Sequence, residues 1–513
     1  MTRPGSANGS GAVLAVDQGT TNTKALLLDG DTGEVVAEGS APAGIRFPAP
    51  GWVEQDADQL WDATVAAIDA CLEQRPDTEV VGIGLSTQRE TAVCWSRSTG
   101  RALGPALGWQ DARTAAWCDD LAAANPRAET LVHDRTGLAL DPMFSAPKFR
   151  AAITTAIDAG ADPRDVAVGT VDSWLVWKLT GEHLTELGNA SRTLLLDLQR
   201  LAWHDDLLAL FGIDGHHLAE VRPSDAGFGA TTTQLGRLGA GVPVAAALAD
   251  SHAALYHHGC TQPGTGKATY GTGTSVMSPT GDLRPAPAGI ATTLAWHTGG
   301  RPTYAREGNI VASGSALDWM AMTLGAPGGA AGGAFLTELA SSVPDSAGVS
   351  FVPAFSGLGA PHWDRSAVGI VTGVSGGTGR AHLARAALEA VAHQVADVVE
   401  AMETDAGARI EVLHADGGAT ASRLLMQLQA DLLSRPLEVA DSPAASALGA
   451  ARLAAERLGV APPAVVTGER VHPTSTSPAA ARAAWARAVS RARGKSVSPQ
   501  THVAGDGEIE RNT

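Results

Sequence analysis

Two aspartates stand at the ends of apolar runs, where a carboxylate could act in chemistry. Asp17 follows VLAV and precedes the turn QGTTNT, and Asp250 follows VPVAAALA. Burying an unpaired carboxylate is costly, so we expect an acid at such a strand end to face a cleft. Asp17 indicates a cationic or phosphate-like partner, and Lys24 either meets a phosphate or faces solvent. For Asp250 the alternative is that it caps a helix beginning at Ser251.

Three glycine-rich turns accompany these acids, at 17–22, 271–274 and 416–420. Each is flanked by strand or helix patterns, and such turns bring backbone N–H groups against phosphate. Two other glycine motifs fit their patterns less well. GTGKAT at 264–269 lacks the first glycine of a P-loop and the Ser or Thr after its lysine. GVSGG at 373–377 fits G-x-S-x-G, but the sequence singles out no partner histidine and acid.

Two polar stretches, STQRE at 86–90 and WQDART at 109–114, are suited to a polyol. Arg89 and Glu90 would offer a cation and a carboxylate to hydroxyl groups, and a local salt bridge is the alternative. The indole of Trp109 would offer an apolar face to a carbon backbone.

Histidines and cysteines do not form a convincing metal-binding pattern. The four cysteines contain no CxxC pair and are expected to fill the core in the reduced state. Three histidines follow Asp250 closely, but their spacing and exposed-type surroundings favour surface or structural roles over metal binding: His252, His257 and His258.

The first half of the chain shows strands alternating with helices, which predicts an α/β architecture. Residues 12–38 indicate three short strands joined by tight turns. A helix is expected at about 56–75 with Asp56 as its cap, followed by a buried strand at 80–86.

Similar signals recur from about residue 265, so we expect two halves with analogous turns facing one cleft. The boundary is predicted near 259–266. A long amphipathic helix is predicted at 380–403, and the third glycine turn ends a strand and opens a helix within 415–433. From about 488 the chain becomes basic, then polar and acidic, which predicts a disordered tail.

The bulk composition excludes several classes of protein. At 513 residues the chain suits about three domains or two large ones. Its net charge of -17 argues against nucleic acid or an anionic membrane as the main partner. Residues 1–12 lack the apolar segment of a signal peptide, and no run of about 18 apolar residues predicts a membrane span. We therefore expect a cytoplasmic protein.

With these motifs in order, the chain resembles the FGGY carbohydrate kinases, most of all their glycerol kinase members. The resemblance covers about residues 12–460, and a family signature matches 369–389. The motifs that carry it are VDQGTTNTK, PGWVEQD, STQRE, WQDART, DSWLVWKLTG, NASRT, YGTG, GLGAPHWD and DGGA.

The resemblance implies two actin-like (ribonuclease H-like) domains around a deep cleft. The N-terminal domain is expected at 12–260, the C-terminal domain at 261–460 and the tail at 488–513. The implied activity is phosphoryl transfer from ATP, with Mg²⁺, to a primary hydroxyl of a small polyol or sugar. Dimers and tetramers are common in the family, but the sequence indicates no interface.

The resemblance also assigns roles to individual residues. Asp17 corresponds to the acid associated with Mg²⁺, and Asp250 to the catalytic base, which we also expect at the metal. The positions matched to the nucleotide are Gly19, Thr20, Thr21, Asn22, Gly271, Thr272, Gly314, Asp318, Gly418 and Ser422. The positions matched to the substrate are Arg89, Glu90, Trp109, Met143, Asp250, Ser251 and Ser275.

Some of these positions depart from the usual glycerol kinase residues. Met143 replaces a tyrosine and Ser275 a phenylalanine, which predicts a roomier pocket. Ser251 and His252 replace two glutamines. Near the nucleotide, Gln and Asn are usual at the positions of Asp318 and Ser422.

Glycerol is the first-choice substrate, and a tetritol, pentitol or ketose is the alternative suited to the roomier pocket. Two rivals from other classes are a non-catalytic sugar or nucleotide sensor and an actin-like ATPase acting on protein partners. The presence of both Asp17 and Asp250 disfavours the sensor, and an ATPase of that kind would not need STQRE or WQDART.

Overall fold

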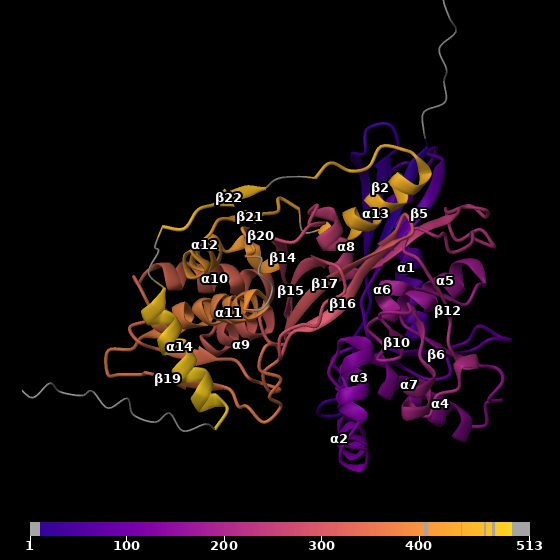
Figure 1. Ribbon diagram of the computed structural model, residues 1–513. Coiled ribbons are helices and arrows are strands. Elements are labelled where there is room, and N and C mark those ends of the chain that lie inside the picture. Colours follow the sequence, from indigo (N-terminus) through magenta and orange to yellow (C-terminus); the bar gives the residue numbers. More distant parts are fainter. Residues whose placement is uncertain (1–10, 405–408, 443, 466–467, 475–477, 495–513) are drawn as a thin grey trace, which may run out of the picture.

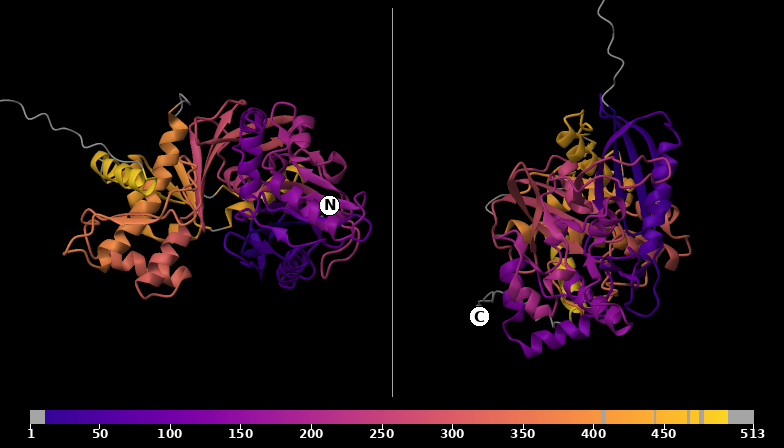
Figure 2. Two further views of the ribbon diagram at one scale, coloured as in Figure 1. Left: turned by 90° about the horizontal axis from the view of Figure 1, so that it is seen from below. Right: turned by 90° about the vertical axis from the view of Figure 1, so that its right-hand side faces the viewer.

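The computed structural model describes residues 11–404, 409–442, 444–465, 468–474 and 478–494. Helices and short strand pairs surround two larger sheets that lie side by side (Figures 1 and 2). One sheet comes from the first half of the chain and the other from the second half. The α/β architecture predicted from the sequence is confirmed.

The first sheet contains the strands predicted at the start of the chain. Its order is β13 (Val244–Ala249), β5 (Val80–Thr87), β1 (Ala12–Gln18), β2 (Asn22–Asp29) and β3 (Val35–Pro42). β1, β2 and β3 run antiparallel, while β5 and β13 are added parallel to β1. The carboxyl ends of parallel strands share an edge, so the polar residues that follow β1, β5 and β13 meet there.

The second sheet repeats this pattern of antiparallel strands followed by parallel ones. Its order is β16 (Ala291–Thr298), β17 (Arg301–Ile310), β15 (Thr274–Gly281), β14 (Thr265–Tyr270), β20 (Val412–Asp416), β21 (Leu437–Val439) and β22 (Glu469–Val471). β14, β15 and β17 are antiparallel neighbours, and β20 and β21 continue parallel to β14. The turn between β14 and β15 therefore corresponds to the turn between β1 and β2.

Helices and short strands surround the two sheets. The helices of the first half are α1 (Ala57–Leu72), α2 (Ala115–Ala124), α3 (Ala128–Thr136), α4 (Ser145–Asp158), α5 (Val171–Thr180), α6 (Leu187–Ala190), α7 (Asp205–Phe211) and α8 (Asp250–His257). Those of the second half are α9 (Gly314–Thr323), α10 (Gly329–Ser341), α11 (Arg380–Glu403), α12 (Arg423–Leu433), α13 (Ala445–Leu458) and α14 (Ala479–Ala492). The remaining strands form two-stranded pairs: β4 (Glu54–Gln55), β6 (Val93–Ser96), β7 (Ala106–Leu107), β8 (Val166–Gly169), β9 (Leu184–Glu186), β10 (Leu196–Asp197), β11 (Ala202–Trp203), β12 (Glu220–Arg222), β18 (Ser350–Val352) and β19 (Ile370–Thr372).

Helix α13 follows the main strands of the second sheet along the chain but packs on the first sheet (Figure 1). Its alanines form one apolar cluster with residues of β1 and β2. The approach is close because glycines face it: a Cβ on Gly84 of β5 would lie 2.3 Å from the carbonyl oxygen of Ala450. The chain therefore returns from its second half to stabilise its first.

The two halves also share a continuous core at their junction. One apolar cluster joins Val13 and Leu248 of the first sheet to Met277 and Trp296 of the second. A second cluster packs Tyr304 of β17 among leucines of the first half. Burial of this apolar surface holds the two sheets together.

Most elements predicted from the sequence are confirmed. Helix α1 begins after Asp56, whose carboxylate accepts hydrogen bonds from the backbone N–H groups of Asp58 and Gln59. The strand predicted at 80–86 is β5, and α11 has the bounds predicted for the long amphipathic helix.

At the two ends of the chain, fewer predictions can be compared with the structure. Residues 1–10 lie outside the described part of the chain. The tail predicted from about residue 488 begins too early in the chain, because α14 extends to Ala492 and Ala488 and Val489 are buried. Residues 495–513 lie outside the described part.

Two further predictions concern the cysteines and membranes. All four cysteines are free and buried, as expected: Cys71, Cys94, Cys118 and Cys260. Among the helices of the described residues, none has the length and apolar character needed to cross a membrane.

Two helical glycines allow a matched test of the packing of α13. A Cβ on Gly449 would lie 1.9 Å from the carbonyl oxygen of Ala253 in α8, whereas a Cβ on Gly333 of α10 meets nothing within 4 Å. We expect Gly449→Ala to lower the free energy of unfolding by about 1–3 kcal/mol through overpacking. Gly333→Ala should raise it by up to about 1 kcal/mol through helix propensity. Calorimetric unfolding measures both, and equal effects would contradict the close contact between α13 and α8.

Candidate active site

A cavity of about 440 Å³ opens between the two sheets, at the edge where β1, β5 and β13 end. It brings together many of the residues singled out in the sequence. Those that line it are Thr20, Thr21, Arg89, Glu90, Trp109, Met143, Asp250, Ser251, Gly271, Thr272 and Ser275. The predicted substrate-binding residues therefore face the same space as parts of both predicted phosphate loops.

Asp17 lies near the end of β1, beside this cavity. The hydroxyl of Ser86 on the neighbouring strand β5 donates to its Oδ1 at 2.7 Å. Burial raises the pKa of Asp17 to about 6, although the hydrogen bond from Ser86 lowers it. The negative charge of Asp250 also raises this pKa, and the positive charge of Lys24 lowers it. Lys24 is the cross-strand partner of Asp17 in the ladder between β1 and β2. Its charge therefore acts on Asp17, whatever else it contacts.

Asp250 is the first residue of α8 and faces the cavity with 35% of its side chain exposed. Its Oδ1 accepts a hydrogen bond from the backbone N–H of Ser251 at 2.6 Å and lies 3.3 Å from Nε of Arg89. Burial raises the pKa of Asp250, and Arg89 opposes the rise. The capping alternative is wrong, because α8 begins at Asp250 itself and Ala249 is in the capping position. The carboxylate accepts a hydrogen bond from the next backbone N–H and faces the cavity.

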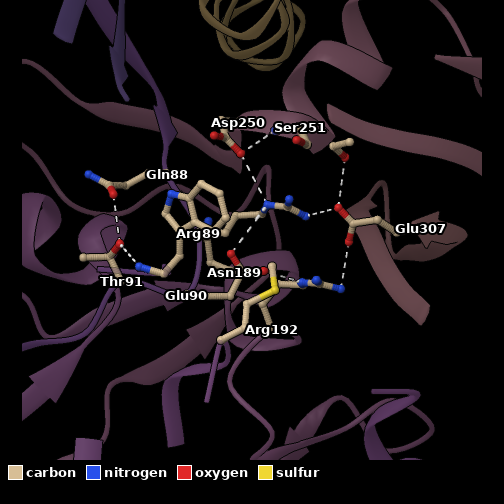
Figure 3. A network of polar contacts seen from close by, with 12 residues as sticks. Gln88, Arg89, Glu90, Thr91, Asn189, Arg192, Asp250, Ser251 and Glu307 are labelled. Carbon is tan, nitrogen blue, oxygen red and sulfur yellow. Dashed lines mark hydrogen bonds and ion pairs between the residues drawn. The ribbon is translucent and has the colours of Figure 1, made fainter. Parts of the chain in front are cut away.

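Arg89 lies between Asp250 on one side and Glu307 on the other (Figure 3). Its Nη1 donates to Oε1 of Glu307 at 2.5 Å, and Glu307 belongs to β17 of the second half. Arg192 completes the group: its Nε donates to Glu90 at 2.7 Å, and its Nη1 lies 2.8 Å from Oε2 of Glu307. The local pairing of Arg89 with Glu90 is longer, at 4.0 Å.

The charges of this group are almost balanced. Arg89 and Arg192 are matched by Glu90 and Glu307, so Asp250 remains as the excess negative charge. Burial opposes ionisation of Glu307, but Arg192 and Arg89 outweigh it and hold its pKa well below the usual range. The two arginines are nearly or fully buried, so their planar guanidinium groups are held in place by these carboxylates.

Glu90 has a left-handed backbone conformation, with φ of 59°. A non-glycine residue pays a conformational cost there, and such positions concentrate where a site requires them. The turn directs Arg89 and Glu90 from consecutive positions into the same network. This explains how STQRE places both charges at the end of β5.

Trp109 and Met143 also line the cavity. The indole Nε1 of Trp109 donates to the hydroxyl of Thr20 at 3.1 Å, which links a predicted substrate residue to the first predicted phosphate loop. The backbone carbonyl of Met143 accepts a hydrogen bond from the buried Lys148 ammonium at 2.7 Å. Burial lowers the pKa of Lys148 to about 7.

The glycine turns lie close to one another because their strands are neighbours. The backbone N–H of Gly314 donates to the carbonyl of Gly271, and a Cβ on Gly314 would lie 2.5 Å from that oxygen. Gly417, with φ of 97°, lies as close to Tyr270: a Cβ would be 2.6 Å from its carbonyl oxygen. Only glycine permits these approaches, so the predicted second and third turns pack against each other.

Several positions matched to the nucleotide or the metal do not line the cavity. They are Asp17, Gly19, Asn22, Gly314, Asp318, Gly418 and Ser422. Asp318 accepts a hydrogen bond from the backbone N–H of Gly329, and Ser422 caps α12 and accepts a hydrogen bond from Thr337. Their assigned roles remain predictions.

Sequence reasoning missed Glu307 and Arg192 as members of the site. A charged residue inside the strand pattern YAREGNI was the available signal for Glu307. Arg192 lies in NASRT, which was noted only as a family motif. Asn309 and Trp363 also line the cavity and were not singled out.

The histidines after Asp250 are buried, so the expected exposed surroundings are wrong. His252 is fully buried and His257 and His258 nearly so, because α8 lies between the two halves. A structural role is confirmed for His258, whose Nε2 lies 2.7 Å from Oδ2 of Asp416. Within the described residues, no three or more His, Cys, Asp or Glu side chains are grouped to hold a metal.

Comparisons with known proteins cover almost the whole chain. The model of the N-terminal domain of the FGGY family of carbohydrate kinases matches residues 12–256, and that of its C-terminal domain matches 266–457. Apulose kinase from Pectobacterium atrosepticum is 43% identical over 94% of this chain and 98% of its own. Glycerol kinase from Alkalilimnicola ehrlichii is 42% identical over the same shares.

Solved structures show the same fold. The structure of Plasmodium falciparum glycerol kinase with ADP has a TM-score of 0.83 at 26% identity, covering 94% of this chain and 98% of that one. Xylulose kinase from Rhodospirillum rubrum has a TM-score of 0.75 at 28% identity, covering 94% and 97%. The expected two actin-like domains are confirmed. The chain belongs to the FGGY family of carbohydrate kinases and is an ATP-dependent kinase of a sugar or polyol.

Proposed function

We propose that this kinase transfers the γ-phosphoryl group of ATP to a primary hydroxyl of glycerol or a closely related polyol. With glycerol the products are glycerol 3-phosphate and ADP. The observation that carries the proposal is the position of Asp250, whose carboxylate faces the cavity lined by Arg89 and by Gly271 and Thr272. A proton acceptor, a hydroxyl-binding cation and a predicted phosphate loop thus share one space.

Asp250 is the proposed general base. As the substrate oxygen bonds to phosphorus and the bond to ADP breaks, the hydroxyl proton passes to this carboxylate. Its raised pKa favours proton acceptance, and Arg89 and the N–H of Ser251 hold it in one orientation. The indole of Trp109 covers an apolar part of the substrate.

The nucleotide would be held by backbone N–H groups of the glycine turns. Asp17 and Asp250 fit Mg²⁺, because the charge of Asp250 raises the pKa of Asp17 and a divalent cation would relieve that repulsion. Mg²⁺ held there would neutralise charge on the phosphates. Free, buried cysteines are compatible with the reducing cytoplasm, where we place the reaction.

A longer polyol or a ketose is the second candidate substrate. Met143 and Ser275 line the cavity at positions where glycerol kinases usually have a tyrosine and a phenylalanine. The aromatic rings that would fill part of the cavity are therefore absent at these two positions. The relative at 43% identity is named an apulose kinase. Loss or gain of hydrogen-bond partners in a buried site can change preference by orders of magnitude.

Turnover on a substrate panel tests the proposed function. Purified protein with Mg-ATP should release ADP in the presence of glycerol, a tetritol, a pentitol or a ketopentose. A coupled ADP assay with each compound, and with no acceptor as the control, measures the rates. Absence of acceptor-dependent ADP release with every compound would contradict the kinase proposal.

Replacement of Asp250 tests the base. Asp250→Asn should keep ATP binding and lower kcat at least ~10²-fold, because the amide still accepts the Ser251 N–H but cannot take a proton. Asp205→Asn is the matched control, since Asp205 is also the first residue of a helix but is exposed and outside the cavity. Titration calorimetry with an ATP analogue checks binding. Near-normal turnover of Asp250→Asn would reject Asp250 as the base.

A further inference from the structure

Lys148 is among the largest side chains that the protein buries completely, although it carries an ammonium group. It lies near the start of α4, where its buried neighbours Phe144, Ala146 and Phe149 belong to an apolar cluster. A charge in such surroundings is costly unless hydrogen bonds satisfy it. A buried ammonium at this position therefore indicates a place where the fold needs a strong hydrogen-bond donor.

The partners of the ammonium are two backbone carbonyls that are far apart in the sequence. Its Nζ donates to the carbonyl of Gly108 at 3.1 Å and to the carbonyl of Met143 at 2.7 Å. Gly108 directly precedes Trp109, and the side chains of Trp109 and Met143 both line the cavity. One buried cation thus joins two stretches of the cavity lining, residues 108–109 and residue 143, which we call the wall segments.

In both wall segments a backbone N–H is held as well as a carbonyl. The peptide group between Gly108 and Trp109 donates its N–H to the hydroxyl of Thr91 at 3.2 Å, while the ammonium binds its oxygen. The N–H of Met143 donates to Oδ1 of Asp141 at 2.9 Å, and its carbonyl accepts from the same ammonium. Both polar atoms are fixed in each case, which sets the direction in which the two side chains leave the backbone.

Acidic groups around Lys148 favour its charged form. Burial lowers the pKa of Lys148 to about 7, and the charges of Glu90, Asp111 and Asp141 oppose this effect. Hydrogen bonds from an ionised donor are stronger than those from a neutral one. These acids therefore strengthen the contact between the ammonium and the two carbonyls.

The first predicted phosphate loop has anchors of its own. The carbonyl of Thr20 accepts a hydrogen bond from Nε2 of Gln55 at 2.8 Å, and the carbonyl of Thr21 accepts one from the backbone N–H of Ala43 at 2.9 Å. Neither contact involves Lys148. Loss of the ammonium should therefore disturb the wall segments and leave this loop in place.

We propose that Lys148 is a positioning residue, which holds the wall segments where the acceptor binds. Lys148 does not line the cavity itself, so it acts through the backbone on the side chains of Trp109 and Met143. The inference rests on the proposed function, in which these two side chains contact the acceptor. Its expected signature is a loss of acceptor binding with little change in the chemical step, because the base and the phosphate loop are held by other contacts.

The experiment compares Lys148→Met and Lys148→Gln with the unaltered protein. Lys178→Met is the matched control, since Lys178 is also a helical lysine, with Nζ 3.9 Å from Asp58, and lies outside the cavity. For each protein, kcat and KM are measured for ATP and for the acceptor that the unaltered protein phosphorylates fastest. We expect Lys148→Met to raise the acceptor KM at least about tenfold, the scale of a hydrogen bond to a charged group.

The changes in kcat and in the KM for ATP should be much smaller, and Lys178→Met should match the unaltered protein. Lys148→Gln keeps neutral N–H donors and should raise the acceptor KM less than Lys148→Met. A merely structural role of Lys148 would affect both KM values alike. That result, or an unchanged acceptor KM in Lys148→Met, would overturn the inference. If Lys148→Met does not fold, an unchanged acceptor KM in Lys148→Gln overturns it.

Hydrogen exchange without substrates separates this inference from the proposed function. Mass spectrometry should show faster exchange of the amides of Trp109 and Met143 in Lys148→Met than in Lys178→Met, with unchanged exchange around Thr20. If the unaltered protein phosphorylates no acceptor, the proposed function fails. Exchange then still decides the role of Lys148, because unchanged exchange in both wall segments rejects it.

Discussion

The cleft depends on one carboxylate, that of Glu307, which reaches from the second half of the chain to two arginines of the first. Arg89 and Arg192 are buried, and their charges would be costly there without partners. Glu90 and Glu307 balance the two positive charges, so Asp250 is not needed to neutralise Arg89. Asp250 lies 3.3 Å from Arg89 and keeps part of its carboxylate exposed. The same contact therefore joins the halves and leaves one acid available.

The packing around this network explains why the cavity lies at one edge. The shared core of β1, β13, β15 and β16 joins the two sheets, and α13 of the second half packs on the first sheet. Glycine and alanine at these contacts allow backbones to approach within van der Waals distance. What remains open is the edge where parallel strands end, the usual place for ligands in such sheets.

The sequence predicted what local patterns encode. The first three strands, α1 with its Asp56 cap, α11 and the acids at strand ends follow from periodicity and turn chemistry. It did not predict the network, because Arg89 and Glu307 are 218 positions apart and nothing local marks their pairing. The burial of His252 was missed for the same reason: α8 looks exposed until a second sheet covers it. The last residues of α14 were predicted as part of the tail, because the pattern of basic residues there gave no sign of the apolar face that the helix buries.

This division also explains why the kinase class is easier to infer from sequence than the acceptor. The predicted phosphate loops act through backbone groups in glycine turns, and each turn is a contiguous, recognisable pattern. In the proposed function the acceptor side is made of side chains from both halves, such as Met143 and Ser275, whose effect depends on the residues packed behind them. Substrate choice is thus a property of the assembled wall, and it can change through single residues while every loop motif stays the same.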